Sequence, residues 1–230
     1  DFSNTCYIIS SLRRPVCADP KTPFWNGKNG MIQTDFDVKD IRELYQPDSE
    51  RLALARRRQA DVWRGKTPDT WPLLLSGQLT QAQERMPAPE IHEACADHSM
   101  MLWQQMRGTC AVANARSDAV PSIRANMGTG TLLAYLGLEQ EFPPGQMPWL
   151  RKHMSVEEAA ACTVDDIQFQ GTFARALEFI AFAREILDNR IDIFCLDTQG
   201  PFDLAHLLLG DQIFYLMMED PSLMHRIMEL

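Results

Sequence analysis

Residues 191–205 read IDIFCLDTQGPFDLA, a short apolar run that passes into polar residues and then into a proline. The run Ile191–Leu196 predicts a strand, and Pro201 at a first helical position predicts a helix directly after it. A helix is also predicted before the strand, because residues 169–188 repeat apolar side chains at spacings of three and four. Strands that alternate with helices are typical of parallel βα units, so the predicted fold class is α/β.

Two earlier segments predict further strands of the same sheet. Residues 71–75 are apolar on both faces and are bounded by Pro68 and Gly77, which favours a buried parallel strand. Residues 119–126 predict the second strand, despite the proline at position 121. Helices are predicted over 47–64, 88–116, 156–161, 201–209 and 211–218. Two further helices are predicted in a short segment ending near Gly137 and from Asp220-Pro221 onwards. The proline-rich segment 141–149 predicts a loop.

The composition excludes several classes of protein. A net charge of -9 argues against a nucleic-acid-binding surface, because such surfaces neutralise phosphates with clustered Lys and Arg. Apolar runs such as 204–209 are far shorter than the roughly 20 residues that cross a bilayer, so we expect no membrane association. The six cysteines form no CxxC pair, which favours free thiols in a reducing compartment, with the cytoplasm as the expected location, over a disulfide framework.

Polar side chains follow two of the predicted strands at the point where each strand ends. Asp197 and Gln199 follow the third strand, and Arg124 and Asn126 stand at the end of the second. In parallel α/β folds, ligands bind and catalytic groups sit at the carboxyl ends of the strands. We therefore expect a ligand-facing role for these residues.

Two other motifs favour structural roles. Gly128-Thr129-Gly130 could hold a phosphate at a helix start, but it lacks the third glycine of a dinucleotide-binding loop and the lysine of a P-loop, so a tight turn is favoured. Residues 92–98 are dense in His, Cys and carboxylates but do not match HExxH. A solvated helix face with Cys95 turned inward is the preferred interpretation, and no metal ligand is assigned.

A set of motifs resembles the uroporphyrinogen decarboxylase superfamily, which includes the decarboxylase and the methylcobamide methyltransferases. The motifs are GPFDLA at 200–205, Gly210, and Asp220-Pro221 followed by Met224-His225-Arg226. GKTPDTWP at 65–72 is similar to the family's entry to its first strand, and 141–149 is similar to a loop of uncharacterised bacterial branches. The resemblance implies a TIM (βα)8 barrel with its site at the carboxyl ends of the strands.

The resemblance also sets the expected domains. Residues 1–46, with several prolines and glycines and little periodicity, predict an irregular arm. Residues 47–230 would then form the first part of the barrel, preceded by helical and irregular segments. Three predicted strands are fewer than the eight of a complete barrel, so the chain is expected to be a fragment of a longer protein.

The function implied by the resemblance is action on a tetrapyrrole or on a corrinoid-linked substrate, with methyl transfer from a methylated corrinoid favoured. The decarboxylase branch of the family carries an R-Q-A-G-R-Y motif, which is missing here. It also carries an aspartate after the second strand, and in this sequence Asn126 stands at or next to that position. An amide cannot supply the anionic charge that stabilises a protonated pyrrole. A decarboxylating lyase of porphyrin biosynthesis and a non-catalytic scaffold that retains the fold remain the alternatives.

The expected site and partners follow from this interpretation. The predicted catalytic residues are Asp197 and Asn126, and the predicted substrate-binding residues are Arg124, Gln199, Pro201 and Phe202. The cofactor is left open, since the resemblance implies that the zinc of the methyltransferase branch is held by residues outside this chain. The expected partners are a small-molecule tetrapyrrole or a corrinoid protein, and a homodimer remains an option.

Overall fold

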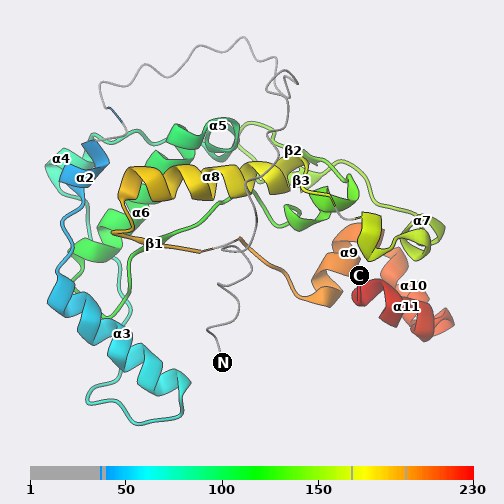
Figure 1. Cartoon of the computed structure of the whole chain (residues 1–230), viewed down its shortest axis with the longest axis horizontal. Helices are drawn as coiled ribbons and strands as arrows, with labels where there is room; N and C mark the ends of the chain where they lie inside the picture. The colour runs from blue at the N-terminus through cyan, green and yellow to red at the C-terminus, as the bar shows by residue number, and fades with distance from the viewer. Residues whose placement is uncertain (1–36, 38–39, 167, 195) are drawn as a thin grey trace. The chain divides into compact units, whose positions relative to one another are not determined.

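A computed structural model describes residues 37, 40–166, 168–194 and 196–230 (Figure 1). The chain divides into two units, 1–33 and 34–230, and all described residues belong to the second. Most of the predicted arm 1–46 therefore lies outside the described residues. The described end of that arm is not irregular, because α2 (Ile41–Leu44) forms there and the side chains of Ile41 and Tyr45 are buried in a hydrophobic cluster.

Most of the regular structure is helical, and the helices begin where the sequence supplies a cap. Asp48, Ser155 and Asp220 each accept a backbone N–H with their side chains at the start of α3, α7 and α11, as their sequence positions predict. The predicted helix 88–116 is instead two helices, because Asp97 ends the first and caps the second. The helices are α3 (Ser49–Trp63), α4 (Gln81–Glu84), α5 (Ile91–Ala96), α6 (His98–Asn114), η2 (Leu132–Leu136), α7 (Val156–Ala161), η3 (Val164–Asp166), α8 (Gly171–Leu187), α9 (Pro201–Leu209), α10 (Gln212–Glu219) and α11 (Pro221–Met228).

The strands are few and short. β1 (Ser122–Ile123) pairs in parallel with β4 (Asp192–Ile193), with Ile123 opposite Ile193. The Phe194 N–H donates to the carbonyl of Ile123 at 2.9 Å and extends the pairing by one residue. β2 (Gln140–Glu141) and β3 (Trp149–Leu150) pair antiparallel and close the predicted proline-rich loop. The fold is thus mixed α/β and mostly helical, and the described residues form no barrel.

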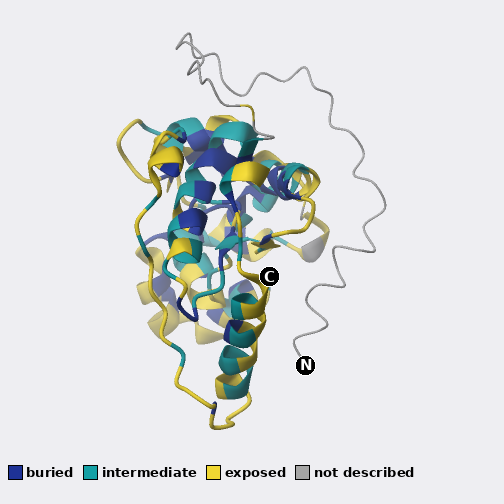
Figure 2. Ribbon diagram, turned by 90° about the vertical axis from the view of Figure 1, so that its left-hand side faces the viewer, coloured by how far each residue is buried: buried dark blue, intermediate teal, exposed yellow. Residues whose placement is uncertain are grey.

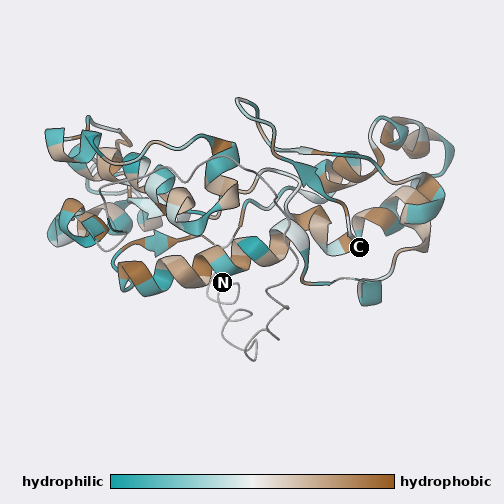
Figure 3. Ribbon diagram, turned by 90° about the horizontal axis from the view of Figure 1, so that it is seen from above, coloured by the Kyte–Doolittle hydropathy of each residue, from teal (hydrophilic) through white to brown (hydrophobic). Residues whose placement is uncertain are grey.

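Two hydrophobic clusters hold the described residues together (Figure 2). The first gathers around α6 and α8 and includes Trp103, Phe179 and Ile123, which are almost completely buried. The second joins α7, η2 and the last three helices through side chains such as Leu209 and Ile213. Figure 3 shows apolar residues on both α8 and the helices α9 to α11. In α8, the buried residues Phe179, Ile180, Ala183 and Leu187 recur at spacings of three and four, in agreement with the predicted amphipathic helix.

The predicted buried strand at residues 71–75 is wrong. No strand forms there, and Trp71, Leu73, Leu74 and Leu75 are 70%, 60%, 61% and 50% exposed. The segment, called the 71–75 strip below, is held through its backbone: the Leu73 N–H donates to Asp118 Oδ2 at 3.1 Å, and the Leu75 N–H donates to Ser117 Oγ at 3.1 Å. Its apolar composition indicated burial, but its side chains meet no covering layer among the described residues.

Candidate functional site

The parallel pairing of β1 and β4 brings three of the predicted site residues together. Arg124 and Asn126 follow β1, and Asp197 follows β4. Arg124 Nη1 lies 3.1 Å from Asp197 Oδ2, and Arg124 Nη2 donates to Asn126 Oδ1 at 3.4 Å. The guanidinium therefore joins the ends of both strands, and we call these three residues the Arg124 cluster.

Burial alternates along the segment that carries the cluster. Ile123, Ala125 and Met127 are each 1% exposed, whereas the side chains between them, Arg124 and Asn126, turn outward. Successive side chains of an extended chain point to opposite sides, so the apolar residues anchor one side while the polar residues face the other. The alternation continues past the end of the strand, and it fixes which face the cluster occupies.

Helices α5 and α6 hold the backbone of this segment. The Arg124 N–H donates to Gln105 Oε1 at 3.3 Å, and Thr109 Oγ1 donates to the carbonyl of Ser122 at 2.9 Å. Cys95 Sγ donates to the carbonyl of Asn126 at 3.5 Å. The backbone of 122–126 is thus held by side chains of α5 and α6.

The Arg124 cluster remains open to solvent. The side chain of Arg124 is 44% exposed and that of Asp197 is 30% exposed. A partly exposed ion pair is weak, because water competes for both charges. A carboxylate ligand can therefore take the place of Asp197 on the guanidinium in the two-bond geometry that arginine favours.

The other three predicted site residues are not brought into the cluster. Among the described residues, no hydrogen bond or ion pair links Gln199 or Pro201 to it, and Pro201 serves as the first residue of α9. Phe202 lies in the first turn of α9, is 39% exposed, and has its ring centroid 6.5 Å from that of Phe214 in α10. Phe202 therefore belongs to an aromatic surface of α9 and α10.

Two of the three described cysteines are buried thiols. Cys95, Cys110 and Cys162 are free, as the sequence predicts, while the other three cysteines lie outside the described residues. Burial raises the pKa of Cys95 to about 12 and that of Cys110 to about 11, so both thiols stay protonated at neutral pH. No three His, Cys, Asp or Glu side chains in the described part of the chain are placed to hold a metal ion. The described residues therefore supply no zinc site of the methyltransferase type, and the resemblance places that site outside this chain.

The glycine motif at 128–130 is a packed turn. A Cβ on Gly128 would lie 2.7 Å from Pro148 Cβ, and one on Gly130 would lie 3.0 Å from Leu150 Cδ2. Gly128 also has a φ of +88°, which side chains rarely adopt. Close packing against the hairpin of β2 and β3 accounts for both glycines, in agreement with the tight turn favoured from the sequence.

A charged network that the sequence did not reveal fixes α3 to the 71–75 strip. Asp118, whose side chain is 4% exposed, lies 3.0 Å from Arg58 and 3.3 Å from Arg51. The Leu73 N–H, followed by these arginines, lowers the pKa of Asp118 below its ordinary value. Arg58 also binds Asp69 through two hydrogen bonds and lowers the pKa of Asp69 to about 2. The run Arg56-Arg57-Arg58 was the only sequence signal of this network.

A shallow hollow lies beside the same network and not at the Arg124 cluster. Its lining includes Asp48, Arg51, Arg116 and Pro121. The Asp48 carboxylate and the Arg116 guanidinium already pair across it at 3.1 Å. None of the predicted site residues lines this hollow, so it adds nothing to their chemistry.

Comparison with models of known protein families, with curated proteins and with solved structures found no match. Within the described part of the chain, no helix is both long and apolar enough to span a membrane.

Proposed function

We propose that the chain forms the first part of a barrel of the uroporphyrinogen decarboxylase type. In this proposal the Arg124 cluster binds a tetrapyrrole or corrinoid-linked substrate, and the reaction is methyl transfer from a methylated corrinoid. The observation that supports it is the meeting of Arg124, Asn126 and Asp197 at the carboxyl ends of adjacent parallel strands. That edge is where parallel α/β proteins bind their ligands.

The chemistry of the cluster suits a substrate with polar side chains on its rim. The Arg124 guanidinium offers donors in a planar fork, and the Asn126 amide both donates and accepts hydrogen bonds. Carboxylates on the rim of a tetrapyrrole, or the amide oxygens on the rim of a corrinoid, would take the place of Asp197 on Arg124. Asp197 would then be free to accept a hydrogen bond from a pyrrole N–H or from an amide of the ligand.

The same geometry favours methyl transfer over decarboxylation. Decarboxylation of a pyrrole acetate needs a carboxylate to stabilise the protonated ring. Asn126, which stands at or next to the position of the decarboxylases' aspartate, is an amide and carries no such charge. Methyl transfer makes no such demand: the methyl group leaves Co(III) as a methyl-cation equivalent and bonds to a thiolate, which yields cob(I)alamin and a thioether.

The first test is ligand binding by the intact 230-residue chain. We would titrate it separately with methylcobalamin and with uroporphyrin and follow the absorbance of each ligand. Asp197→Ala and Arg124→Gln should each raise the Kd about 10-fold or more while leaving the melting temperature nearly unchanged, because both side chains are partly exposed. Arg151→Gln is the matched control, since Arg151 forms an exposed 3.0 Å ion pair with Glu141 in the β2–β3 hairpin. An unchanged Kd in the Asp197 and Arg124 variants would refute the site.

The second test separates an enzyme from a scaffold. The proposed activity predicts that methylcobalamin with a thiol acceptor is converted to cob(I)alamin, which has its own absorbance spectrum. Binding without conversion by the intact protein, which would include the zinc-binding residues, would favour the non-catalytic scaffold. Release of CO2 from uroporphyrinogen would instead favour the decarboxylase.

A further inference from the structure

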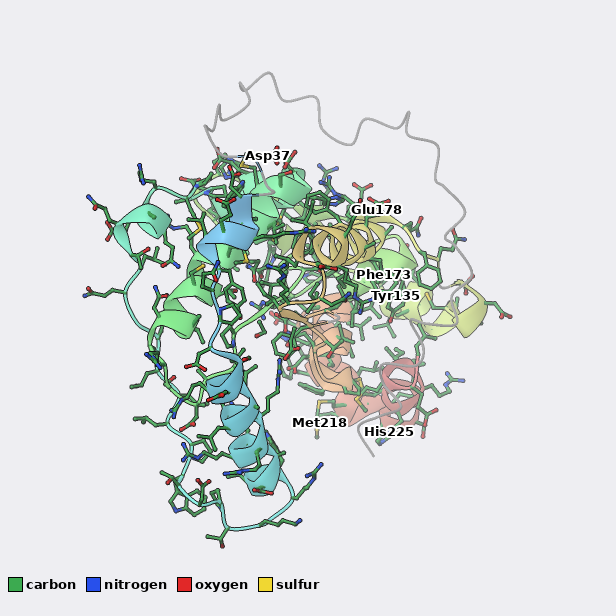
Figure 4. The ribbon with its side chains drawn as sticks, turned by 60° about the vertical axis from the view of Figure 1, so that its left-hand side comes forward. Asp37, Tyr135, Phe173, Glu178, Met218 and His225 are labelled. Carbon is green, nitrogen blue, oxygen red and sulfur yellow. The ribbon has the colours of Figure 1, made fainter. Side chains whose placement is uncertain are left out.

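Helix α10 carries a second apolar face on the side away from the core. Ile213 and Leu216 are its buried residues, and they pack in the second hydrophobic cluster. At 100° per residue, Met218 lies nearly opposite these two, with Phe214 and Tyr215 on either side of it. Met218 is 83% exposed, Tyr215 69% and Phe214 51%. Figure 4 shows the Met218 side chain extending outward from its helix.

The apolar face continues onto α9. The ring of Phe202 lies 6.5 Å from that of Phe214, and the ring of His206 lies 5.4 Å from it on the same side. We call Phe202, Phe214, Tyr215, Met217 and Met218 the α10 patch. A helix that is apolar on all sides is normally buried on all sides, and contiguous exposed apolar groups mark interaction surfaces.

Acidic side chains, called the acidic rim below, lie near the ends of the two helices that carry this patch. Asp203 follows Phe202 in the first turn of α9, and Glu219 and Asp220 follow Met218. Asp211, whose side chain is 94% exposed, stands before α10 and lies 3.7 Å from His206. Between residues 197 and 230 the sequence has six Asp and Glu residues, against Arg226 as the single Lys or Arg.

We propose that the α10 patch binds an amphipathic helix of a partner protein whose apolar face is bordered by Lys and Arg. The acidic rim selects such a partner by charge complementarity, and it opposes a second copy of this chain, which would bring two acidic rims together. Exposed methionines suit the role, because their unbranched side chains adapt to the surface of a bound helix. The side-chain ridges of one helix pack into the grooves of another, so the exposed face of α10 suits a helical partner.

The test uses the intact chain and a synthetic amphipathic helix of leucine and lysine, about 18 residues or five turns long. Fluorescence anisotropy of the labelled peptide would give its Kd. A peptide of the same composition in scrambled order measures attraction to net charge alone, and a leucine–glutamate helix tests the sign of the charge. The proposal expects tight binding of the leucine–lysine helix, weaker binding with added salt, and at least about 10-fold weaker binding of both controls.

Variants of the patch decide where the peptide binds. The double variant Tyr215→Ser/Met218→Ser should raise the Kd about 10-fold or more, whereas Met147→Ser/Trp149→Ser, which alters two other exposed apolar residues, should leave it unchanged. Asp211→Asn/Glu219→Gln should reduce the dependence of the Kd on salt. Circular dichroism would verify that each variant is folded.

Three outcomes would overturn the proposal. Equal loss of binding in both apolar double variants would place the contact elsewhere, and equal affinity for the scrambled peptide would show attraction to net charge alone. A concentration-dependent dimer in light scattering that Tyr215→Ser/Met218→Ser dissociates would identify a second copy as the occupant.

Discussion

The 71–75 strip and the segment 119–126, which contains β1, are both predicted to be strands, but they differ in burial. Both combine apolar residues with a proline, and both predict a strand of a parallel sheet. Ile123 is 1% exposed because β4 pairs beside it and the cluster around α6 and α8 covers it. Leu74 is 61% exposed, although the backbone of the strip is bonded to residues 117 and 118. Apolar sequence thus indicates which residues can be buried, and the presence of a covering layer decides which are buried.

The largest expected difference between the two segments is the loss of stability when a side chain is shortened to alanine. Ile123→Ala should lower the free energy of unfolding by about 2–5 kcal/mol, because it removes buried methyl groups and leaves a cavity. Leu74→Ala should change it by less than about 0.5 kcal/mol, because most of its side chain is already in water. Urea unfolding followed by circular dichroism measures both. A comparable loss in Leu74→Ala would mean that the strip is covered in solution.

The next effect concerns the charged anchor of the strip. Asp118→Asn should cost about 2 kcal/mol, because it leaves Arg58 and Arg51 without their buried carboxylate partner. The control is Asp192→Asn in β4, whose side chain is 56% exposed and pairs with Arg56 at 2.8 Å. It should change the stability by less than about 0.5 kcal/mol. Similar losses in the two variants would contradict a special role for the buried carboxylate.

A glycine substitution tests whether the strip is held by its backbone. The Gly77 N–H donates to the carbonyl of Ala111 at 2.7 Å, and a Cβ at Gly77 would lie 2.9 Å from the Ala115 nitrogen. Gly77→Ala should therefore destabilise the protein by about 1–2 kcal/mol. Gly108→Ala, in the exposed middle of α6 with no atom near the new Cβ, should stabilise it by about 0.5–1 kcal/mol. Thermal unfolding should show a lower melting temperature for Gly77→Ala and a higher one for Gly108→Ala. An unchanged melting temperature in Gly77→Ala would show that the strip can move away from α6.

The smallest expected effect is on acid stability. The pKa of Asp69 is held at about 2 by Arg58, and the pKa of Asp118 is lowered by the Leu73 N–H. Carboxylates with a lowered folded pKa stabilise the protein above the ordinary pKa of about 4 and lose that contribution as the pH falls toward the folded value. Wild-type stability should therefore fall more steeply between pH 4 and pH 2 than that of Asp69→Asn/Asp118→Asn. Urea unfolding at each pH would give the free energy of unfolding of both proteins. If the two free energies fell in parallel with pH, Asp69 and Asp118 would not contribute to the acid sensitivity of the protein.

The helices could be predicted because their signals are local. Ser155 and Asp220-Pro221 mark helix starts within three residues of the groups they cap, and the predicted helices form there. The division of 88–116 was missed because Asp97, one residue in an otherwise continuous pattern, uses its side chain as a cap.

The candidate site was predictable only where strand pairing fixed it. Arg124, Asn126 and Asp197 stand within four residues of the ends of paired strands, so the rule for parallel sheets brings them together. Gln199 and Phe202 depend on the path of residues 197–200, which has no periodic signal, and they do not join the cluster. The buried Asp118 could not be predicted, because its partners lie in segments far from it in sequence.

The pairing of β1 with β4 has a consequence for the order of events during synthesis. Ser122 faces Asp192, so the ribosome must add about 70 residues after the first strand before its partner exists. At a synthesis rate of roughly 5–20 residues per second, these residues take about 4–14 seconds to add, and during that time β1 has no strand to pair with. During that interval Ile123 and the residues around it are exposed to other nascent chains. The early helix α6 is the element that can shield them, and a slow stretch of translation between residues 124 and 192 would prolong the exposure.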